Sequence, residues 1–76
     1  MTFEIFVAYP PDRESGVAEI HVRDGDTVHI PAEVFFEGDV LRIRMFSRGG
    51  SGVWQYPLDE WLSAIRRAAE ALGCGP

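Results

Sequence analysis

The sequence has no lysine, no asparagine and a single cysteine among its 76 residues. One cysteine excludes an internal disulfide, and it also excludes the cysteine-rich metal modules. No apolar run reaches the length that a membrane-spanning helix needs. The first residues, Met-Thr-Phe-Glu, lack the basic stretch that opens a signal peptide. These absences predict one cytoplasmic domain, residues 1–76, because a chain of this length has no room for a second core.

The acidic side chains are concentrated in the first half of the chain. Residues 1–40 contain nine acidic residues and two arginines, whereas residues 41–76 contain three acidic residues and five arginines. The formal net charge is −5. Because an acidic protein repels phosphate, this balance disfavours a nucleic-acid partner and favours a partner with a basic surface. The alternative is that the charge serves solubility alone.

Alternating apolar residues predict β-strands over most of the chain, and a change to helical spacing predicts one helix near its end. The strands are expected at 3–9, 17–23, 27–36, 39–46 and 53–56, and the helix at 58–72. Pro57 before the helix and Gly73 after it are typical boundary signals. The expected fold is therefore α+β, an antiparallel meander of four or five strands with one C-terminal amphipathic helix packed on one sheet face.

Two turns let the strand register be predicted. A three-residue loop from Asp24 to Asp26 matches apolar with apolar side chains, and a two-residue turn at Glu37-Gly38 is expected to join the next two strands. The predicted facing pairs are Ile20 with Ile30, Val22 with Val28 and His21 with His29 across the first turn, and Val34 with Leu41 and Ala32 with Ile43 across the second.

The two histidines are the first candidates for chemistry. If His21 and His29 face each other, with Glu19 on the same sheet face, the three side chains can bind Zn²⁺ or form a pH-sensitive patch. The alternative is two surface residues on neighbouring strands. Nothing in the sequence supplies a further fixed ligand or a pocket, so we predict no metal site.

No arrangement of residues indicates catalysis. The glycine- and serine-rich segment 47–52 lacks the Lys-Ser/Thr ending of a phosphate-binding loop, and no helix is predicted directly after it. Cys74 has no local basic cluster to activate it, and no serine lies in a recognisable motif with a histidine. We therefore expect a protein that is not an enzyme and that carries no cofactor.

Aromatic and arginine side chains form a more informative pattern. One helix covers only one sheet face, so Phe6 and Phe46 are expected on the other face, beside His21, Arg42 and Arg44. Exposed aromatic residues together with arginine are typical of interface hot spots. Two alternatives stay open, namely that the sheet curls and buries these aromatics as a second small core, and that they stack on nucleic-acid bases.

One stretch of the chain resembles a known family. The segment 27–34, Thr-Val-His-Ile-Pro-Ala-Glu-Val, followed by Gly-Asp-Val-Leu at 38–41, resembles the swapped-hairpin AbrB-type DNA-binding domains. In that family Ile-Pro-Ala-Glu opens a short helix, for which this segment is too short, and Asp24 and Asp26 stand where basic residues are expected. In size and charge the chain is also similar to small bacterial immunity proteins and phage-encoded anti-CRISPR inhibitors.

These observations favour a small acidic protein-binding module, an inhibitor or adaptor that occludes its partner sterically and electrostatically. The alternatives are a nucleic-acid binder of AbrB-like or stacking type and a homodimer that pairs through Phe6 and Phe46. The predicted partner-binding residues are Phe6, Asp12, His21, Asp24, Asp26, Glu37, Asp39, Arg42, Arg44, Phe46 and Arg48, of which Arg42, Arg44 and Phe46 also serve the nucleic-acid alternative.

Overall fold

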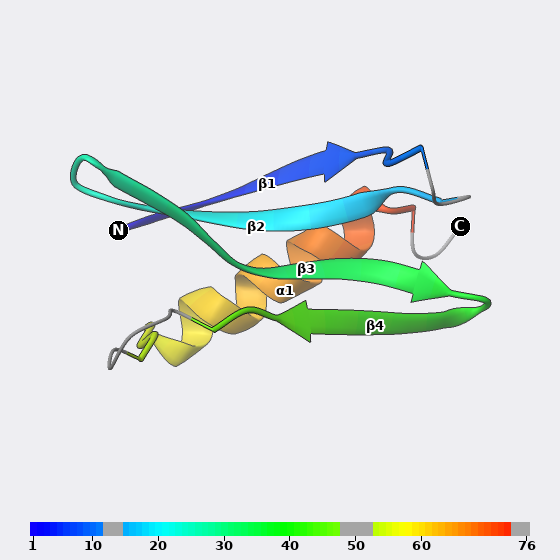
Figure 1. The fold of residues 1–76 in the computed structure, drawn as a ribbon. Coiled ribbons are helices and arrows are strands. Elements are labelled where there is room, and N and C mark those ends of the chain that lie inside the picture. Colours follow the sequence, from blue (N-terminus) through cyan, green and yellow to red (C-terminus); the bar gives the residue numbers. More distant parts are fainter. Residues whose placement is uncertain (12–14, 48–52, 74–76) are drawn as a thin grey trace.

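Four strands form one antiparallel sheet, and a single helix lies diagonally across one of its faces (Figure 1). The computed structural model describes residues 1–11, 15–47 and 53–73. The elements are β1 (Thr2–Ala8), β2 (Val17–Asp24), β3 (Thr27–Glu37), β4 (Val40–Met45) and α1 (Leu58–Ala71). The strand order β1-β2-β3-β4 confirms the predicted α+β meander with its C-terminal helix. Residues 53–57 form neither helix nor strand, so the expected strand at 53–56 is absent.

Both hairpin turns that join β2 to β3 and β3 to β4 contain a Gly-Asp pair. Gly25 and Gly38 have positive φ values of 64° and 65°, whereas no non-glycine residue in the described ranges does. A positive φ at the first turn residue alone is typical of a type II′ turn, which takes glycine at that position. The turns are therefore 25–26 and 38–39, and both predicted turn positions were wrong.

The shifted turns change the strand register. Glu37 pairs with Val40, so Val34 faces Ile43 and Ala32 faces Met45, two residues away from the predicted partners. A shift of two keeps every side chain on its expected face, because side chains alternate with a period of two. Leu41, Ile43 and Met45 of β4 therefore lie on the same side of the sheet as Ala32 and Val34, which is the helix side.

The register between β2 and β3 also contains a β-bulge. Ile20 pairs with Ala32 but Val22 pairs with His29, so Ile30 and Pro31 together oppose one residue of β2. Proline lacks the N–H that a regular ladder needs, which explains why the bulge forms here. The predicted facing pairs are therefore wrong. The two-residue turn shifts Val22 from Val28 to His29 and removes the pairing of His21 with His29, and the bulge adds the further shift that pairs Ile20 with Ala32 and not with Ile30.

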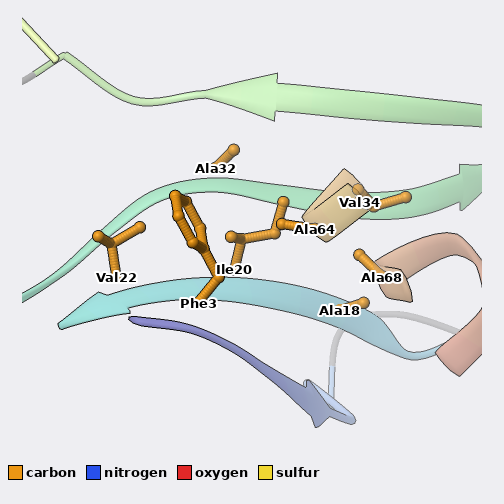
Figure 2. Packing of buried hydrophobic residues seen from close by; sticks show 8 residues of the cluster. All are labelled: Phe3, Ala18, Ile20, Val22, Ala32, Val34, Ala64 and Ala68. Carbon is orange, nitrogen blue, oxygen red and sulfur yellow. The ribbon is translucent and has the colours of Figure 1, made fainter. Parts of the chain in front are cut away.

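The core lies between the sheet and α1. The helix packs on β1, β2 and β3, and Ala64 and Ala68 of the helix are fully buried in one cluster with side chains of these strands (Figure 2). Ile20 and Val22 are among the largest fully buried side chains, and burial of each contributes about 1.5–3 kcal/mol. Small alanines on the helix let these larger strand side chains fill the space between the two layers.

The helix begins and ends where the sequence predicts, within one residue. Pro57 is the N-cap residue, and its carbonyl oxygen accepts a hydrogen bond from the Trp61 N–H at 2.9 Å. At the other end Gly73 has a φ of 74°, and its N–H donates to the carbonyl oxygen of Glu70 at 2.9 Å. In the described part of the chain, no helix is both long and apolar enough to span a membrane.

Candidate functional site

The sheet face opposite α1 carries the aromatic, histidine and strand arginine candidates, Phe6, His21, Arg42, Arg44 and Phe46. Phe6 on β1 is 47% exposed, and its ring lies 4.4 Å from the ring of His21 on β2, measured between centroids. The Nε2 atom of His21 donates a hydrogen bond to Glu19 Oε1 at 2.9 Å. Phe6 and His21 therefore form one contact on this face, as their predicted positions imply.

The two candidate arginines on β4 are paired with glutamates of β3. Arg42 Nε lies 3.2 Å from Glu37 Oε1, and Arg44 Nη1 lies 3.1 Å from Glu33 Oε1. The Arg44 guanidinium carbon also lies 5.0 Å from the centroid of the Phe35 ring, within range of a cation–π contact. The acidic first half and the basic second half of the chain thus meet across β3 and β4.

Some aromatic residues of this face are buried and others are exposed, so each of the two alternatives, a second small core and an exposed aromatic surface, applies to part of the face. Phe35 is only 7% exposed although it lies on the face opposite α1, and the neighbouring Val17 on β2 is also buried. Phe6 and Phe46 are exposed. The face therefore combines a small buried patch with exposed aromatic rings.

The candidate acidic residues lie at the two ends of the sheet. Asp24 ends β2 and Asp26 lies in the β2–β3 turn, whereas Glu37 ends β3 and Asp39 lies in the β3–β4 turn at the opposite end of the sheet (Figure 1). The structure therefore does not bring the two acidic turns together. The candidates Asp12 and Arg48 and most of the segment 47–52 lie outside the described residues, as does Cys74.

The second histidine lies on the helix side of the sheet, in an aromatic cluster. The ring of His29 stacks on that of Trp54 at 3.9 Å between centroids, and His29 Nε2 lies 2.6 Å from the Tyr56 hydroxyl oxygen. The Tyr56 ring in turn stacks at 5.0 Å on that of Trp61 of the helix. Burial removes the Tyr56 hydroxyl from water and raises the pKa of this group above its ordinary value.

This arrangement separates the two histidines that were considered together as metal ligands. His21 contacts Glu19 on one sheet face, whereas His29 contacts Tyr56 on the other. Among the residues that the structure describes, no group of three histidine, cysteine, aspartate or glutamate side chains is placed to hold a metal ion.

One shallow depression lies beside the helix, where α1 passes β1. Its volume is about 230 Å³, and it is lined by Phe3, Asp59, Glu60, Ser63 and Arg67. Arg67 Nη2 donates a hydrogen bond to the Phe3 carbonyl oxygen at 2.8 Å, so this cation is already engaged. Ser63 is the one hydroxyl of the lining, and no histidine lies there to act as its base.

A row of exposed apolar side chains lies on β4. All six residues of β4 are exposed, including the apolar row Leu41, Ile43 and Met45, of which Ile43 is 41% and Met45 57% exposed. This row faces the helix side, but α1 packs on β1, β2 and β3. We call Leu41, Ile43 and Met45 the β4 row.

None of the three residues of the β4 row is among the partner-binding residues predicted from the sequence. A helix with its side chains is about 10–12 Å wide, and strands are about 4.8 Å apart, so one helix covers two or three strands. Four strands under one helix therefore leave an edge strand uncovered. The row of alternating apolar residues in the last strand was the signal from which this could have been inferred.

Two exposed leucines lie on the flank of α1 that faces away from β1. Arg67 marks the flank near β1, because its side chain bonds to the Phe3 carbonyl oxygen. Leu62 lies about 140° from Arg67 around the helix axis and is exposed, as is Leu58 one turn earlier. The exposed leucines thus lie on the side of the helix toward β3 and β4.

The chain matches no family model, no curated protein and no solved structure. The AbrB-type resemblance of the segments 27–34 and 38–41 is therefore carried by those residues alone. In this chain the Ile-Pro-Ala-Glu stretch lies in β3 and forms the bulge, where that family opens a short helix.

Proposed function

We propose that this chain is a protein-binding module, an inhibitor or adaptor, and that it binds its partner through β4. The observation that carries the proposal is the exposure of β4 on both of its faces at the edge of the sheet. An edge strand has one row of backbone N–H and C=O groups without a strand neighbour, and these groups pair readily with an extended segment of another protein.

In this proposal the partner segment adds to the sheet beside β4. Backbone hydrogen bonds between the two strands supply affinity that depends little on sequence, and contacts with the β4 row select apolar residues at alternate positions. A segment held in this way is no longer accessible to its other partners. The module therefore acts by steric occlusion, and it needs no catalytic group.

The charge distribution favours a partner with basic residues around the bound segment. Glu37 and Asp39 flank the start of β4, and the protein carries a formal net charge of −5. Such a field raises the rate of encounter with a basic surface. The pairing of Arg42 with Glu37 and of Arg44 with Glu33 supports a protein partner over a nucleic acid, because phosphate contacts would compete with both ion pairs.

Affinity capture with matched variants tests the proposal. We immobilise the wild-type protein and the variants Ile43→Arg and Ile30→Arg. Each is then incubated at moderate salt with a lysate of the organism that encodes the protein. Ile43 and Ile30 are exposed to similar extents, 41% and 39%, but only Ile43 lies on β4. We expect a protein that wild type and Ile30→Arg retain and Ile43→Arg loses.

Amide hydrogen exchange on the recovered complex gives the second test. The amides of residues 40–45 are expected to gain protection when the partner binds, more than those of β1. A partner that binds all three proteins equally, or that protects β1 and leaves β4 unchanged, contradicts the proposal.

A further inference from the structure

The two edges of the sheet differ in how they are protected. On β1, the Arg67 guanidinium of the helix donates to the Phe3 carbonyl oxygen at 2.8 Å, and Phe3 itself is buried. On β4, residues 40–45 contain neither proline nor lysine, and their register with β3 is unbroken. Proline, bulges and unpaired charged side chains such as lysine are the usual means by which proteins prevent edge strands from pairing, and the two charged side chains of β4, Arg42 and Arg44, are each paired with a glutamate of β3. Strand β4 carries none of the three.

We propose that a second copy of the chain occupies this edge, with the two β4 strands paired antiparallel about a two-fold axis. This inference rests on the proposed function, because it takes β4 as the docking strand. In the absence of another partner protein, β4 pairs with β4 of a second copy. The result is a continuous eight-stranded sheet with both helices on the same face. It differs from the predicted homodimer that pairs through Phe6 and Phe46.

The sequence of β4 selects one register for this pair. In an antiparallel pair, facing residues share a sheet face, so the two-fold axis must pass through a residue and not between two. An axis at Ile43 places Ile43 opposite its counterpart and Leu41 opposite Met45 of the second copy, which gives three apolar pairs. An axis at Arg42 or at Arg44 gives two apolar pairs and places one arginine opposite itself.

The charges on the other face are compatible with the Ile43-centred register. It places Arg42 of each copy opposite Arg44 of the other, and two unpaired arginines at this distance would repel. Each arginine, however, is held by a glutamate of β3 in its own copy, at 3.2 Å for Glu37 and 3.1 Å for Glu33. The four arginines and four glutamates across the seam therefore carry no net charge.

The apolar face of the seam has the same self-complementarity. The β4 row of each copy meets the β4 row of the other beside the helix flanks that carry Leu58 and Leu62. The side chains of the β4 row and of both leucines are exposed in the single chain and lie on the helix side of the sheet. A second copy thus supplies the apolar cover for β4 that its own helix does not.

Light scattering combined with size-exclusion chromatography tests the inference. The wild-type mass is expected to rise with concentration from 8.5 kDa toward twice that value. Ile43→Glu is expected to weaken dimerisation at least tenfold, and Ile30→Glu, with a similar exposure, is expected to leave it unchanged. Circular dichroism of each variant shows whether the fold is intact. A strictly monomeric wild type at millimolar concentration overturns the inference.

Cysteine cross-linking tests the register without relying on a disruptive substitution. In a Cys74→Ser background, Ile43→Cys is expected to form a covalent dimer on mild oxidation, because the axis places this position opposite itself. Leu41→Cys alone is expected to cross-link far more slowly, and Leu41→Cys combined with Met45→Cys as fast as Ile43→Cys. Equal cross-linking of the two single variants contradicts the register.

The same variants separate this inference from the proposed function. If wild type stays monomeric but Ile43→Arg loses a captured partner, the proposed dimer is wrong and the proposal that β4 binds a partner protein is supported. If wild type dimerises through Ile43 but capture does not depend on this residue, the second copy stands and the proposed function is wrong.

Discussion

His29 Nε2 lies 2.6 Å from the hydroxyl oxygen of Tyr56, although 27 residues separate the two in the sequence. The contact exists because the two-residue Gly25-Asp26 turn pairs His29 with the buried Val22, which places the His29 side chain on the helix side of the sheet. It connects β3 to residues 53–57, which form neither helix nor strand. This aromatic cluster therefore fixes the segment that leads into α1.

Replacement of His29 by alanine is expected to lower the free energy of unfolding by about 1–3 kcal/mol. The variant loses one hydrogen bond and one stacked ring, each worth about 0.5–1.5 kcal/mol. His21→Ala is the control, because its hydrogen bond to Glu19 and its contact with the exposed Phe6 ring lie on the open sheet face, where their loss is expected to cost less. Urea unfolding measures both, and an equal effect of the two substitutions contradicts the role given to His29.

Stability at alkaline pH is expected to depend on Tyr56. Burial raises the pKa of Tyr56 above its ordinary value of 10.0, which the unfolded chain retains. Folding therefore favours the neutral phenol, so this contribution to stability is complete below pH 10 and is lost as the pH rises through the higher folded-state pKa. Unfolding free energies measured from pH 8 upward should show a fall that Tyr56→Phe lacks. Tyr9→Phe, at an exposed residue, should retain that fall.

Two isoleucines on opposite sides of the bulge should respond differently to the loss of one methylene group. Ile20 is fully buried, and Ile20→Val is expected to cost about 0.5–1.5 kcal/mol. Ile30 is 39% exposed, and Ile30→Val should change stability by less than about 0.5 kcal/mol. If the predicted pairing of these two residues were correct, both substitutions would be costly. Thermal unfolding of the two variants distinguishes the registers.

The turn glycines can be tested in the same way. Gly38 has a φ of 65°, and a Cβ atom there meets no atom within 4 Å, so backbone strain alone opposes a side chain. Gly38→Ala is expected to cost about 1–2 kcal/mol. Asp39→Ala, at the next residue of the same turn, should cost less than about 0.5 kcal/mol. The assignment of a type II′ turn fails if Asp39→Ala is the more damaging of the two.

The periodicity of the sequence was sufficient to predict the fold class, the four strands and the helix. The change from alternation to helical spacing is a property of each segment alone, and it does not require knowledge of the neighbouring strands. The face on which the β4 row lies could be predicted for the same reason, since an error of two residues at Gly38 leaves the faces unchanged.

The register around His29 could not be obtained from the apolar pattern. Matching Val22 with Val28 is a sound criterion for a regular hairpin, but the Gly25-Asp26 turn and the bulge at Pro31 each shift the register by one residue. Together they return the later part of β3 to the expected face, whereas the turn alone places His29 on the side of Tyr56. The Gly-Asp pairs and the proline were visible in the sequence, but their combined effect depends on the aromatic cluster.

Strand β4 as a candidate site follows from geometry and not from any motif. The selected residues Phe6 and His21 are in contact, whereas the two acidic turns are far apart at opposite ends of the sheet. The sequence shows which side chains alternate on β4, but not which strands the helix reaches. That depends on the direction in which α1 crosses the sheet.

Alanines make up half of the eight buried residues shown in Figure 2, and Ala64 and Ala68 place the helix close to the sheet backbone. Glycine is the only residue smaller than alanine. Any larger residue at these positions would push the helix away from the sheet. Natural sequence variation in this fold should therefore be unequal across the molecule. The alanine contact is expected to stay nearly fixed while β4 and the turns, whose side chains are exposed, accept a wider range of residues.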